Sequence, residues 1–319
     1  MADNQDRPIL VLGGTGHYGQ HIVRSLVDKG AAVRVLSRNA VQAREILGDA
    51  PEIFEGDITS RESYAGALEG VKAAVISVSA FSPKLIRKLE LIEKDSVLEF
   101  LTEAKKEGLK RMVYISIYDI RTDLPKGAHQ ESARIKSAVE SALASSDFNW
   151  TVLGAPPSME LFFTLIRGSN MMVPGGGPPA LPAISPVDLG EIAAQAALRE
   201  DLSGKRFRLA GPEALSFREA ADRISTVLGK SIKVRAIPLI LPDMARIITR
   251  PLTPFSDTIF FINQMLGFVT LLNAFPQDIA AEASNDHKIL LDTFDYHPTS
   301  LEMEARNRGK GRGARGNSE

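Results

Sequence analysis

The sequence predicts an α/β fold of the Rossmann type: a doubly wound parallel sheet with a smaller C-terminal substrate lobe. Short apolar segments alternate with amphipathic segments through the first half of the chain, which is typical of crossover units and a parallel sheet. A glycine-rich turn follows the first apolar segment, where such sheets bind dinucleotides. The 319 residues are 44% apolar and 24% charged, a globular composition that excludes wholesale disorder.

Charge and cysteine content exclude several classes of function. The 38 basic and 39 acidic side chains leave a net charge of -1, which argues against nucleic acid as the main partner. The chain has no cysteine, so disulfides and thiolate metal sites are impossible. His17 and His21 have the spacing of a zinc motif, but Tyr18 stands where that motif needs glutamate, and we expect no metal site. The polar, acidic N-terminus does not resemble a secretory signal, and we expect a cytoplasmic protein.

The first half of the chain predicts six strands with helices between them. The run Ile9–Leu12 is continuously apolar, as in strands that are buried on both faces of a sheet. Ile22, Val23 and Leu26 recur on one helical face, and Gly30 ends that helix. Thr59-Ser60-Arg61-Glu62 predicts a capping box. The predicted strands are 9–12, 32–36, 52–54, 73–78, 111–116 and 150–153, and the helices are 17–29, 41–47, 59–70, 83–107 and 131–145.

The second half is less regular. Residues 155–184 contain a Gly- and Pro-rich run, and long irregular segments often line sites. The later elements predicted are a helix over 186–197, a strand over 206–209, a helix that a capping box opens at Ser216 and Gly229 ends, and a strand over 233–237. Residues 258–277 carry no charge, but Asn263 and Gln264 interrupt their apolar character. They predict a buried helix or a partner surface rather than a membrane span.

This pattern divides the chain into two lobes and a tail. We expect a dinucleotide-binding core over 1–154, completed by about 185–211. Residues 155–184 and 212–303 would form a smaller substrate or partner lobe. The Gly- and Arg-rich residues 304–319 would form a disordered basic tail.

The glycine turn has the spacing Gly13-x-x-Gly16-x-x-Gly19 and links the first strand to the first helix. Gly13 permits the tight turn, Gly16 lets a pyrophosphate approach the backbone, and Gly19 lets the helix pack on the sheet. Backbone N–H groups and the helix dipole then hold the phosphates. We therefore expect a dinucleotide here, contacted also by Thr15, His17 and Tyr18.

The end of the second strand indicates which dinucleotide is bound. A carboxylate there would bind the ribose hydroxyls of NAD, but this chain has Ser37-Arg38-Asn39. A guanidinium pairs with a phosphate dianion, so Arg38 favours NADP, with Arg34 the weaker candidate. The alternative is that Arg38 is only a solvated charge.

Other strand ends complete the predicted cofactor site. Asp57 is suited to accept a hydrogen bond from the adenine amino group, but a plain turn residue explains it equally well. The remaining cofactor candidates follow strands, whose carboxyl ends line the ligand crevice in such sheets: Ile58, Ser77, Val78, Ser79, Ala155 and Pro156.

Lys136 is the main catalytic candidate. It lies on the helix after the fifth strand, and Ser116, which ends that strand, is a further catalytic candidate. An ammonium beside the nicotinamide ribose would hold its hydroxyls and help to deliver a proton, so Lys136 is also a cofactor candidate. The alternative is an exposed helix lysine.

Together these segments resemble the NmrA-like branch of the atypical short-chain dehydrogenase/reductase superfamily. The resemblance spans roughly residues 8–230 and implies a nucleotide-binding sheet with a small C-terminal lobe. The segments that carry it are 11–19, 35–38, 55–57, 113–116, Lys136 with Val139 and Glu140, 150–153 and 186–189.

One departure from this resemblance bears on function. The superfamily usually has Tyr-x-x-x-Lys with tyrosine as the acid, but Ser132 stands at the tyrosine position. A serine hydroxyl is far less acidic than a phenol, so another donor is needed, and Tyr118 and His129 are the candidates nearby. The resemblance implies two functions: a reductase that uses NADPH on a small apolar or aromatic substrate, or a non-catalytic redox sensor that acts on a protein partner. Either form could be an oligomer.

Overall fold

A seven-stranded parallel sheet forms the centre of the first of two compact units. The computed structural model describes residues 7–120, 128–273 and 278–315. The first unit contains the described residues of Met1–Lys126, Gln130–Ala155 and Leu189–Arg208. Its strand order is β3-β2-β1-β4-β5-β6-β9, the Rossmann order, which confirms the predicted fold class. The strands are β1 Ile9–Leu12, β2 Val33–Ser37, β3 Glu52–Glu55, β4 Ala73–Ile76, β5 Arg111–Ile117, β6 Asn149–Ala155 and β9 Lys205–Arg208.

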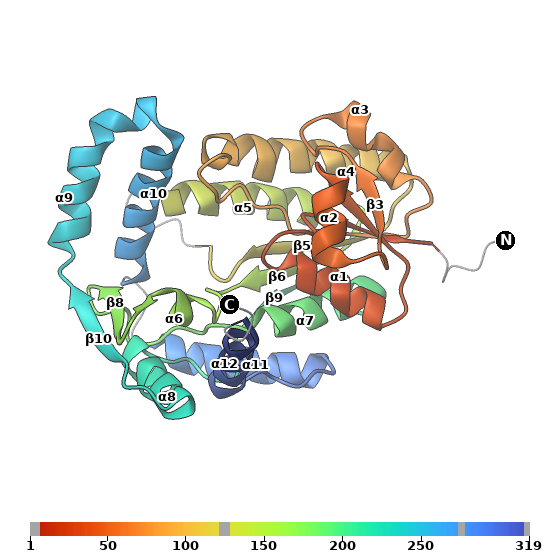
Figure 1. The fold of residues 1–319 in the computed structure, drawn as a ribbon. Coiled ribbons are helices and arrows are strands. Elements are labelled where there is room, and N and C mark those ends of the chain that lie inside the picture. Colours follow the sequence, from red (N-terminus) through yellow and green to blue (C-terminus); the bar gives the residue numbers. More distant parts are fainter. Residues whose placement is uncertain (1–6, 121–127, 274–277, 316–319) are drawn as a thin grey trace. The chain divides into compact units, whose positions relative to one another are not determined.

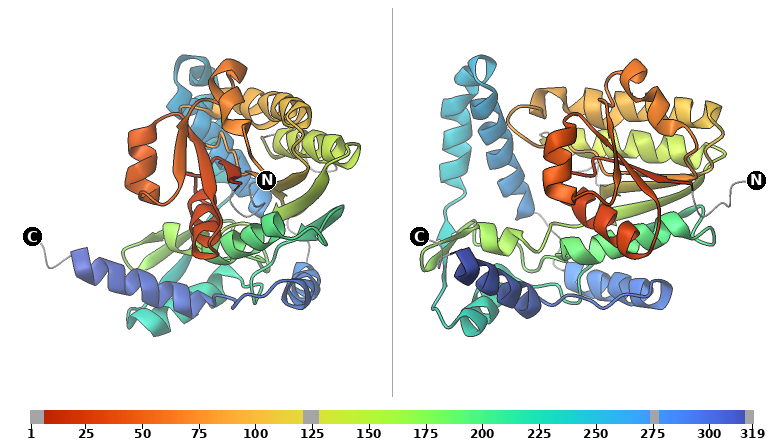
Figure 2. Two further views of the ribbon diagram at one scale, coloured as in Figure 1. Left: turned by 90° about the vertical axis from the view of Figure 1, so that its right-hand side faces the viewer. Right: turned by 45° about the vertical axis from the view of Figure 1, so that its right-hand side comes forward.

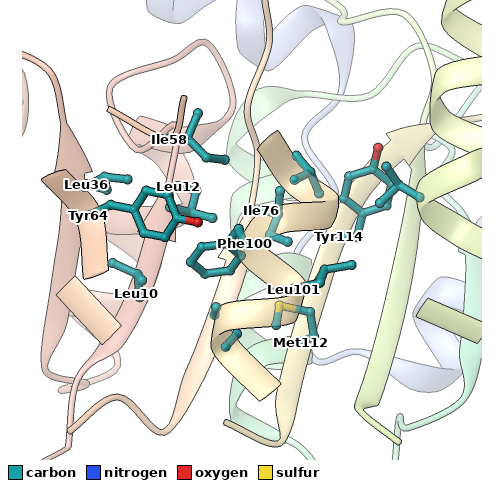
Figure 3. Packing of buried hydrophobic residues seen from close by; sticks show 14 of the residues in the cluster. Leu10, Leu12, Leu36, Ile58, Tyr64, Ile76, Phe100, Leu101, Met112 and Tyr114 are labelled. Atoms are coloured by element: carbon teal, nitrogen blue, oxygen red, sulfur yellow. The ribbon is translucent and has the colours of Figure 1, made fainter. Parts of the chain in front are cut away.

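Helices cover both faces of this sheet. Figures 1 and 2 show α4 and α5 side by side on one face and α1 and α7 on the other. Leu10, Leu12, Met112 and Tyr114 belong to the core beneath α4 and α5, where Figure 3 shows them with Tyr64 and Phe100. The helices are α1 Gly19–Asp28, α2 Ala40–Leu47, α3 Arg61–Tyr64, the 3-10 turns η1 Ala65–Leu68 and η2 Ile86–Lys88, the π-helical turn η3 Leu91–Asp95, α4 Ser96–Lys106, α5 Ala128–Ala144 and α7 Pro186–Leu198.

Two helical predictions in this unit are wrong in detail. The expected single helix over 83–107 is broken into η2, η3 and α4. The expected capping box at 59–62 is also absent, because Thr59 donates its N–H and hydroxyl to Asp57 Oδ1 and the Ser60 side chain does not cap α3. The first segment therefore stays helical through 86–106 but changes type along its length, and a local turn replaces the second feature.

The second unit contains the described residues of Gly127–His129, Pro156–Asp188 and Leu209–Glu319. A three-stranded sheet of order β10-β8-β7 packs against α8, whose capping box between Ser216 and Glu219 is confirmed. In the Gly- and Pro-rich segment, Gly177 leaves room for the Phe217 ring. The elements are α6 Leu161–Thr164, β7 Ile166–Arg167, β8 Asn170–Pro174, α8 Phe217–Leu228, β10 Lys233–Ile237, α9 Ile240–Thr249, the 3-10 turn η4 Arg250–Phe255, α10 Asp257–Leu272, α11 Ile279–Thr293 and α12 Leu301–Arg315.

Helix α9 and the turn η4 expose large apolar side chains. Ile247 is 72% exposed and Phe255 is 86% exposed, and Ile240, Met244 and Ile248 lie on the same α9 face as Ile247. The opposite side of α9 is joined to α10 by hydrogen bonds, because the Asn263 amide of α10 donates to Arg246 O and to Thr249 Oγ1. Among the helices of the described residues, none has both the length and the apolar character needed to cross a bilayer.

The prediction of a disordered tail over 304–319 is wrong for the part of it that the structure describes. Helix α12 runs through Leu301–Arg315 and packs on α8. Leu301 and Ala305, four residues apart on one helical face, are buried in the core of the second unit. Arg308 extends the contact, because its guanidinium pairs with Glu160 and Glu304. Burial on that one face stabilises a helix that the composition alone disfavours.

A buried carboxyl joins the start of α7 to the segment before α12. Asp188 Oδ2 accepts the Thr299 N–H at 2.8 Å, and Asp188 Oδ1 accepts the Thr299 hydroxyl at 2.6 Å. Burial raises the pKa of Asp188 to about 6, although the hydrogen bonds from Thr299 act to lower it. The ionised form therefore costs stability at neutral pH.

This environment predicts an unusual pH dependence of stability. The folded-state pKa lies above that of the unfolded chain, so the contribution is fully present only below the unfolded-chain pKa of about 4 and is lost as the pH rises through 6. The expected loss is about 3 kcal/mol of the free energy of unfolding. Urea unfolding of the wild type and Asp188→Asn between pH 4 and 7 measures it. Asp222→Asn, at an exposed site on α8, is the control, and equal pH slopes in the wild type and Asp188→Asn would contradict the prediction.

Candidate functional site

The glycine turn brings the end of β1 into close contact with β4 and α1. Gly13 has φ +78°, and a Cβ on it would lie 2.4 Å from Ser77 O. A Cβ on Gly19 would lie 2.0 Å from Gly13 O, so α1 packs directly on the turn backbone. Neither position accepts a side chain, which agrees with the roles that the spacing assigns to them.

Gly16 differs from these two glycines because it is exposed. Its N–H donates to Gly13 O at 2.9 Å, and the nearest atom to a Cβ on it would be Gly13 O at 3.1 Å. Thr15 is half-buried, His17 is exposed, and the His17 and Tyr18 rings lie 4.7 Å apart between centroids. The first turn of α1 has no acidic side chain, so its positive dipole end can accept an anion.

The end of β2 presents Arg38 to solvent. Arg34, the weaker candidate, binds Glu52 through Nε at 2.8 Å and donates Nη1 to the Ala67 and Glu69 carbonyls. Ser37 is half-buried, and Asn39 caps α2 by accepting the Gln42 N–H at 2.9 Å. Arg38 is therefore better placed than Arg34 to meet a ligand phosphate.

The ends of β3 and β4 contribute smaller groups. Asp57 Oδ1 is engaged in the turn with Thr59, as the plain-turn alternative has it, and Ile58 is buried. After β4, Ser77 donates its N–H to Leu12 O at 2.9 Å, which holds this segment beside the glycine turn. Val78 is half-buried and Ser79 is exposed.

Lys136 on α5 is buried, unlike the exposed lysine of the alternative. It is 7% exposed, and its Nζ lies 3.0 Å from Oε2 of Glu93, which is 5% exposed. Nζ also lies 5.2 Å from the centroid of the Tyr114 ring. Burial opposes the charged form, but the Tyr114 oxygen and the Glu93 carboxylate outweigh it and raise the pKa of Lys136 above its usual value. The lysine is therefore a fixed cation at neutral pH.

Two other predicted catalytic residues end β5. Ser116 is buried, and its hydroxyl has no hydrogen-bond partner among the described residues. Tyr118 is also buried, its N–H donates to Ala155 O at 2.8 Å, and Arg208 of β9 stacks 4.3 Å from its ring centroid. The buried Ser116 hydroxyl is a polar group that a ligand would satisfy.

Most of the predicted residues therefore lie at the carboxyl edge of one sheet. Pro156 belongs to the second unit, and the side chain of His129 lies outside those that the structure describes. Sequence reasoning missed two residues: Glu93, and Arg206, which binds Glu140 at 2.9 Å and the Ile117 carbonyl at 2.9 Å. No local pattern marks Glu93, since its neighbours Leu91 and Asp95 are exposed and its ion-pair partner Lys136 lies on another helix.

Comparison with known proteins identifies the type of fold and domain. A family model described as NAD(P)H-binding matches residues 13–160. A solved structure of the triphenylmethane reductase of Citrobacter sp., complexed with NADP(H), superposes with a TM-score of 0.70 over 95% of this chain and 99% of that one, at 18% identity.

Two relatives that align with more than two thirds of this chain have names that describe different roles. The photosystem II assembly factor Ycf39 of Guillardia theta is 25% identical over 305 residues, which cover 92% of this chain and 91% of that protein. The NAD(P)H azoreductase of Xenophilus azovorans is 25% identical over 234 residues, which cover 72% and 77%. With the glycine turn and sheet order described above, these matches show a Rossmann-type fold and, over residues 13–160, a match to a family of NAD(P)H-binding domains.

Proposed function

We propose that this protein is an NADPH-dependent reductase of the NmrA-like branch that transfers hydride to a small apolar or aromatic acceptor. The buried cation Lys136, on the helix that follows β5, is the observation that carries the proposal. Burying the Lys136–Glu93 pair costs desolvation energy, and buried ionisable groups at the edge of such a sheet are candidates for a functional site.

The residues of the first unit fit a nicotinamide dinucleotide. The exposed Gly16 face and the dipole of α1 would hold the pyrophosphate, and Arg38 would pair with the 2′-phosphate of NADP. Lys136 and Ser116 would hold the ribose and orient the nicotinamide end. When bound, the cofactor supplies the hydride, and the protein supplies position and charge.

The available side chains favour hydride acceptors that do not need a proton from the protein during hydride transfer. Ser132 is a poor acid, and Lys136 has a raised pKa, which makes it a poor proton donor at neutral pH. A conjugated acceptor such as a quinone, an azo dye or a delocalised cation spreads or loses charge when it takes up hydride. The names of two similar proteins, an azoreductase and a triphenylmethane reductase, are consistent with this class.

A second function, a redox sensor that acts on a protein partner, is favoured by a different observation. The exposed apolar face of α9 and η4, with Ile247 and Phe255 as its most exposed members, is suited to a protein contact. Similarity to a protein named a photosystem II assembly factor is consistent with a role that involves a protein partner. Reduction of any acceptor at a useful rate would favour the enzyme over the sensor.

The phosphate site can be tested at Gly16. Gly16→Val should weaken NADPH binding by more than about a hundredfold, because the side chain fills the face where the pyrophosphate would lie. The thermal midpoint should change little. Gly19→Ala is the contrast, since its Cβ meets Gly13 O and should lower stability as well. Calorimetric titration and thermal unfolding measure both effects, and retained affinity in Gly16→Val would place the dinucleotide elsewhere.

Cofactor choice can be tested at Arg38. Arg38→Asp should weaken NADPH binding about tenfold to a hundredfold more than NADH binding, because a repulsive carboxylate replaces a phosphate partner. Arg44→Asp, an equal change of charge at an exposed α2 position, controls for long-range electrostatics. Equal losses for both cofactors would remove Arg38 from the proposed 2′-phosphate site.

The catalytic role can be tested at Lys136. Lys136→Met should lower turnover about a hundredfold or more while NADPH affinity falls less than tenfold, because the cation acts most strongly as charge develops in the transition state. A screen of quinones, enones and aromatic aldehydes for NADPH oxidation supplies the acceptor. Because Glu93 would be left buried and unpaired, the double variant with Glu93→Gln keeps the test valid if the single variant is unstable. Full activity in either variant would refute the assignment.

A further inference from the structure

We infer that Glu93 is a positioning residue of this site, which keeps Lys136 charged and ties it to the segment after β4. This inference rests on the proposed function, because it assigns Glu93 a task in the binding of NADPH. Glu93 touches neither the glycine turn nor Arg38 in any described contact, so it acts through Lys136.

Both oxygens of the Glu93 carboxylate are engaged, on different elements. Oε2 lies 3.0 Å from the Lys136 ammonium of α5. Oε1 accepts the Ala80 N–H at 2.7 Å, in a buried hydrogen bond. Ala80 directly follows Ser77, Val78 and Ser79, the residues proposed to lie along the dinucleotide. One side chain therefore connects the proposed catalytic cation to the segment after β4 that is proposed to face the cofactor.

The backbone that carries Glu93 is not a regular α-helix. It lies in the π-helical turn η3, Leu91–Asp95, between η2 and α4. A π turn inserts extra backbone into a helix and is often found at functional sites. Ile92 and Glu93 are both buried, while Leu91 and Asp95 are exposed. The irregular turn thus presents a charged residue to the interior beside an apolar one.

The surroundings of Lys136 explain why it needs this partner. Tyr114 faces it from β5, and burial raises the pKa of that phenol, which keeps it neutral. Glu140, one turn further along α5, is paired with Arg206 of β9. Glu93 of η3 therefore supplies the compensating charge at ion-pair distance. Without it, a buried ammonium loses its proton more readily.

The experiment replaces the charge but keeps the shape. In Glu93→Gln, burial acts on Lys136 without the compensating carboxylate, and the pKa of Lys136 should fall to about 8 or below. NADPH binding should then weaken severalfold between pH 7 and pH 9, by no more than the loss expected for Lys136→Met, whereas wild-type binding changes little over that range. NMR of ¹³Cε-labelled lysine, with the Lys136 signal assigned by its loss in Lys136→Met, measures the pKa. Fluorescence titration with NADPH measures affinity at each pH.

Glu103→Gln is the matched control, because Glu103 lies on α4 and is paired with Arg61 and Lys106 instead. It should change neither the Lys136 signal nor the pH profile. An unchanged Lys136 pKa in Glu93→Gln, or a lowered pKa with an unchanged binding profile, overturns the inference.

Two further results keep the test independent of the variant's stability and of the proposed function. In the wild type, the Lys136 signal should remain that of an ammonium up to about pH 10, and deprotonation below that pH overturns the inference even if Glu93→Gln does not fold. Failure of the folded wild type to bind NADPH overturns the proposed function, and this outcome is visible without any variant.

Discussion

The close backbone contacts of the glycine turn fix how β1, α1 and the end of β4 lie at the carboxyl edge of the sheet. Gly19 approaches Gly13 O, and Gly13 approaches Ser77 O, at distances that no side chain tolerates. Helix α1 therefore begins directly on the backbone of the turn, and β1 lies tightly against the end of β4. This packing leaves Gly16 as the exposed member of the three, and so makes the turn a cradle rather than a filled corner.

A second constraint, the buried pair of Lys136 and Glu93, extends this edge toward α5. Burying either charge alone is expensive, and a pair is retained only where good geometry and further hydrogen bonds satisfy it. The Ala80 N–H supplies such a bond. The pair therefore couples α5, η3 and the β4 segment, which are far apart in the chain. A mutation in any of the three elements is expected to reach the lysine.

The strands and the glycine turn were predictable because their signals are local. Apolar runs such as Ile9–Leu12 predicted the strands of the parallel sheet, and the glycine spacing predicted the tight turn after β1. The elements that differ from the prediction depend on distant contacts. Glu93 in the irregular turn η3 is paired with Lys136 on α5, and Ala305 of α12 is buried in the second unit's core. No short pattern in the chain reports either partner, so Glu93 could be found only once the two helices were placed together.

Ser132 and the charged Lys136 together limit the chemistry that this edge supports. A simple ketone needs a proton as hydride arrives, and the usual phenol that gives it is replaced by a weak acid. Glu93 further restricts proton donation at this site, because a lysine that is held as a cation releases its proton less readily. The same fixed charge, however, stabilises an anion that forms nearby, without any proton transfer. Within the proposed function, the ion pair thus argues for electrostatic stabilisation of a conjugated acceptor over acid catalysis.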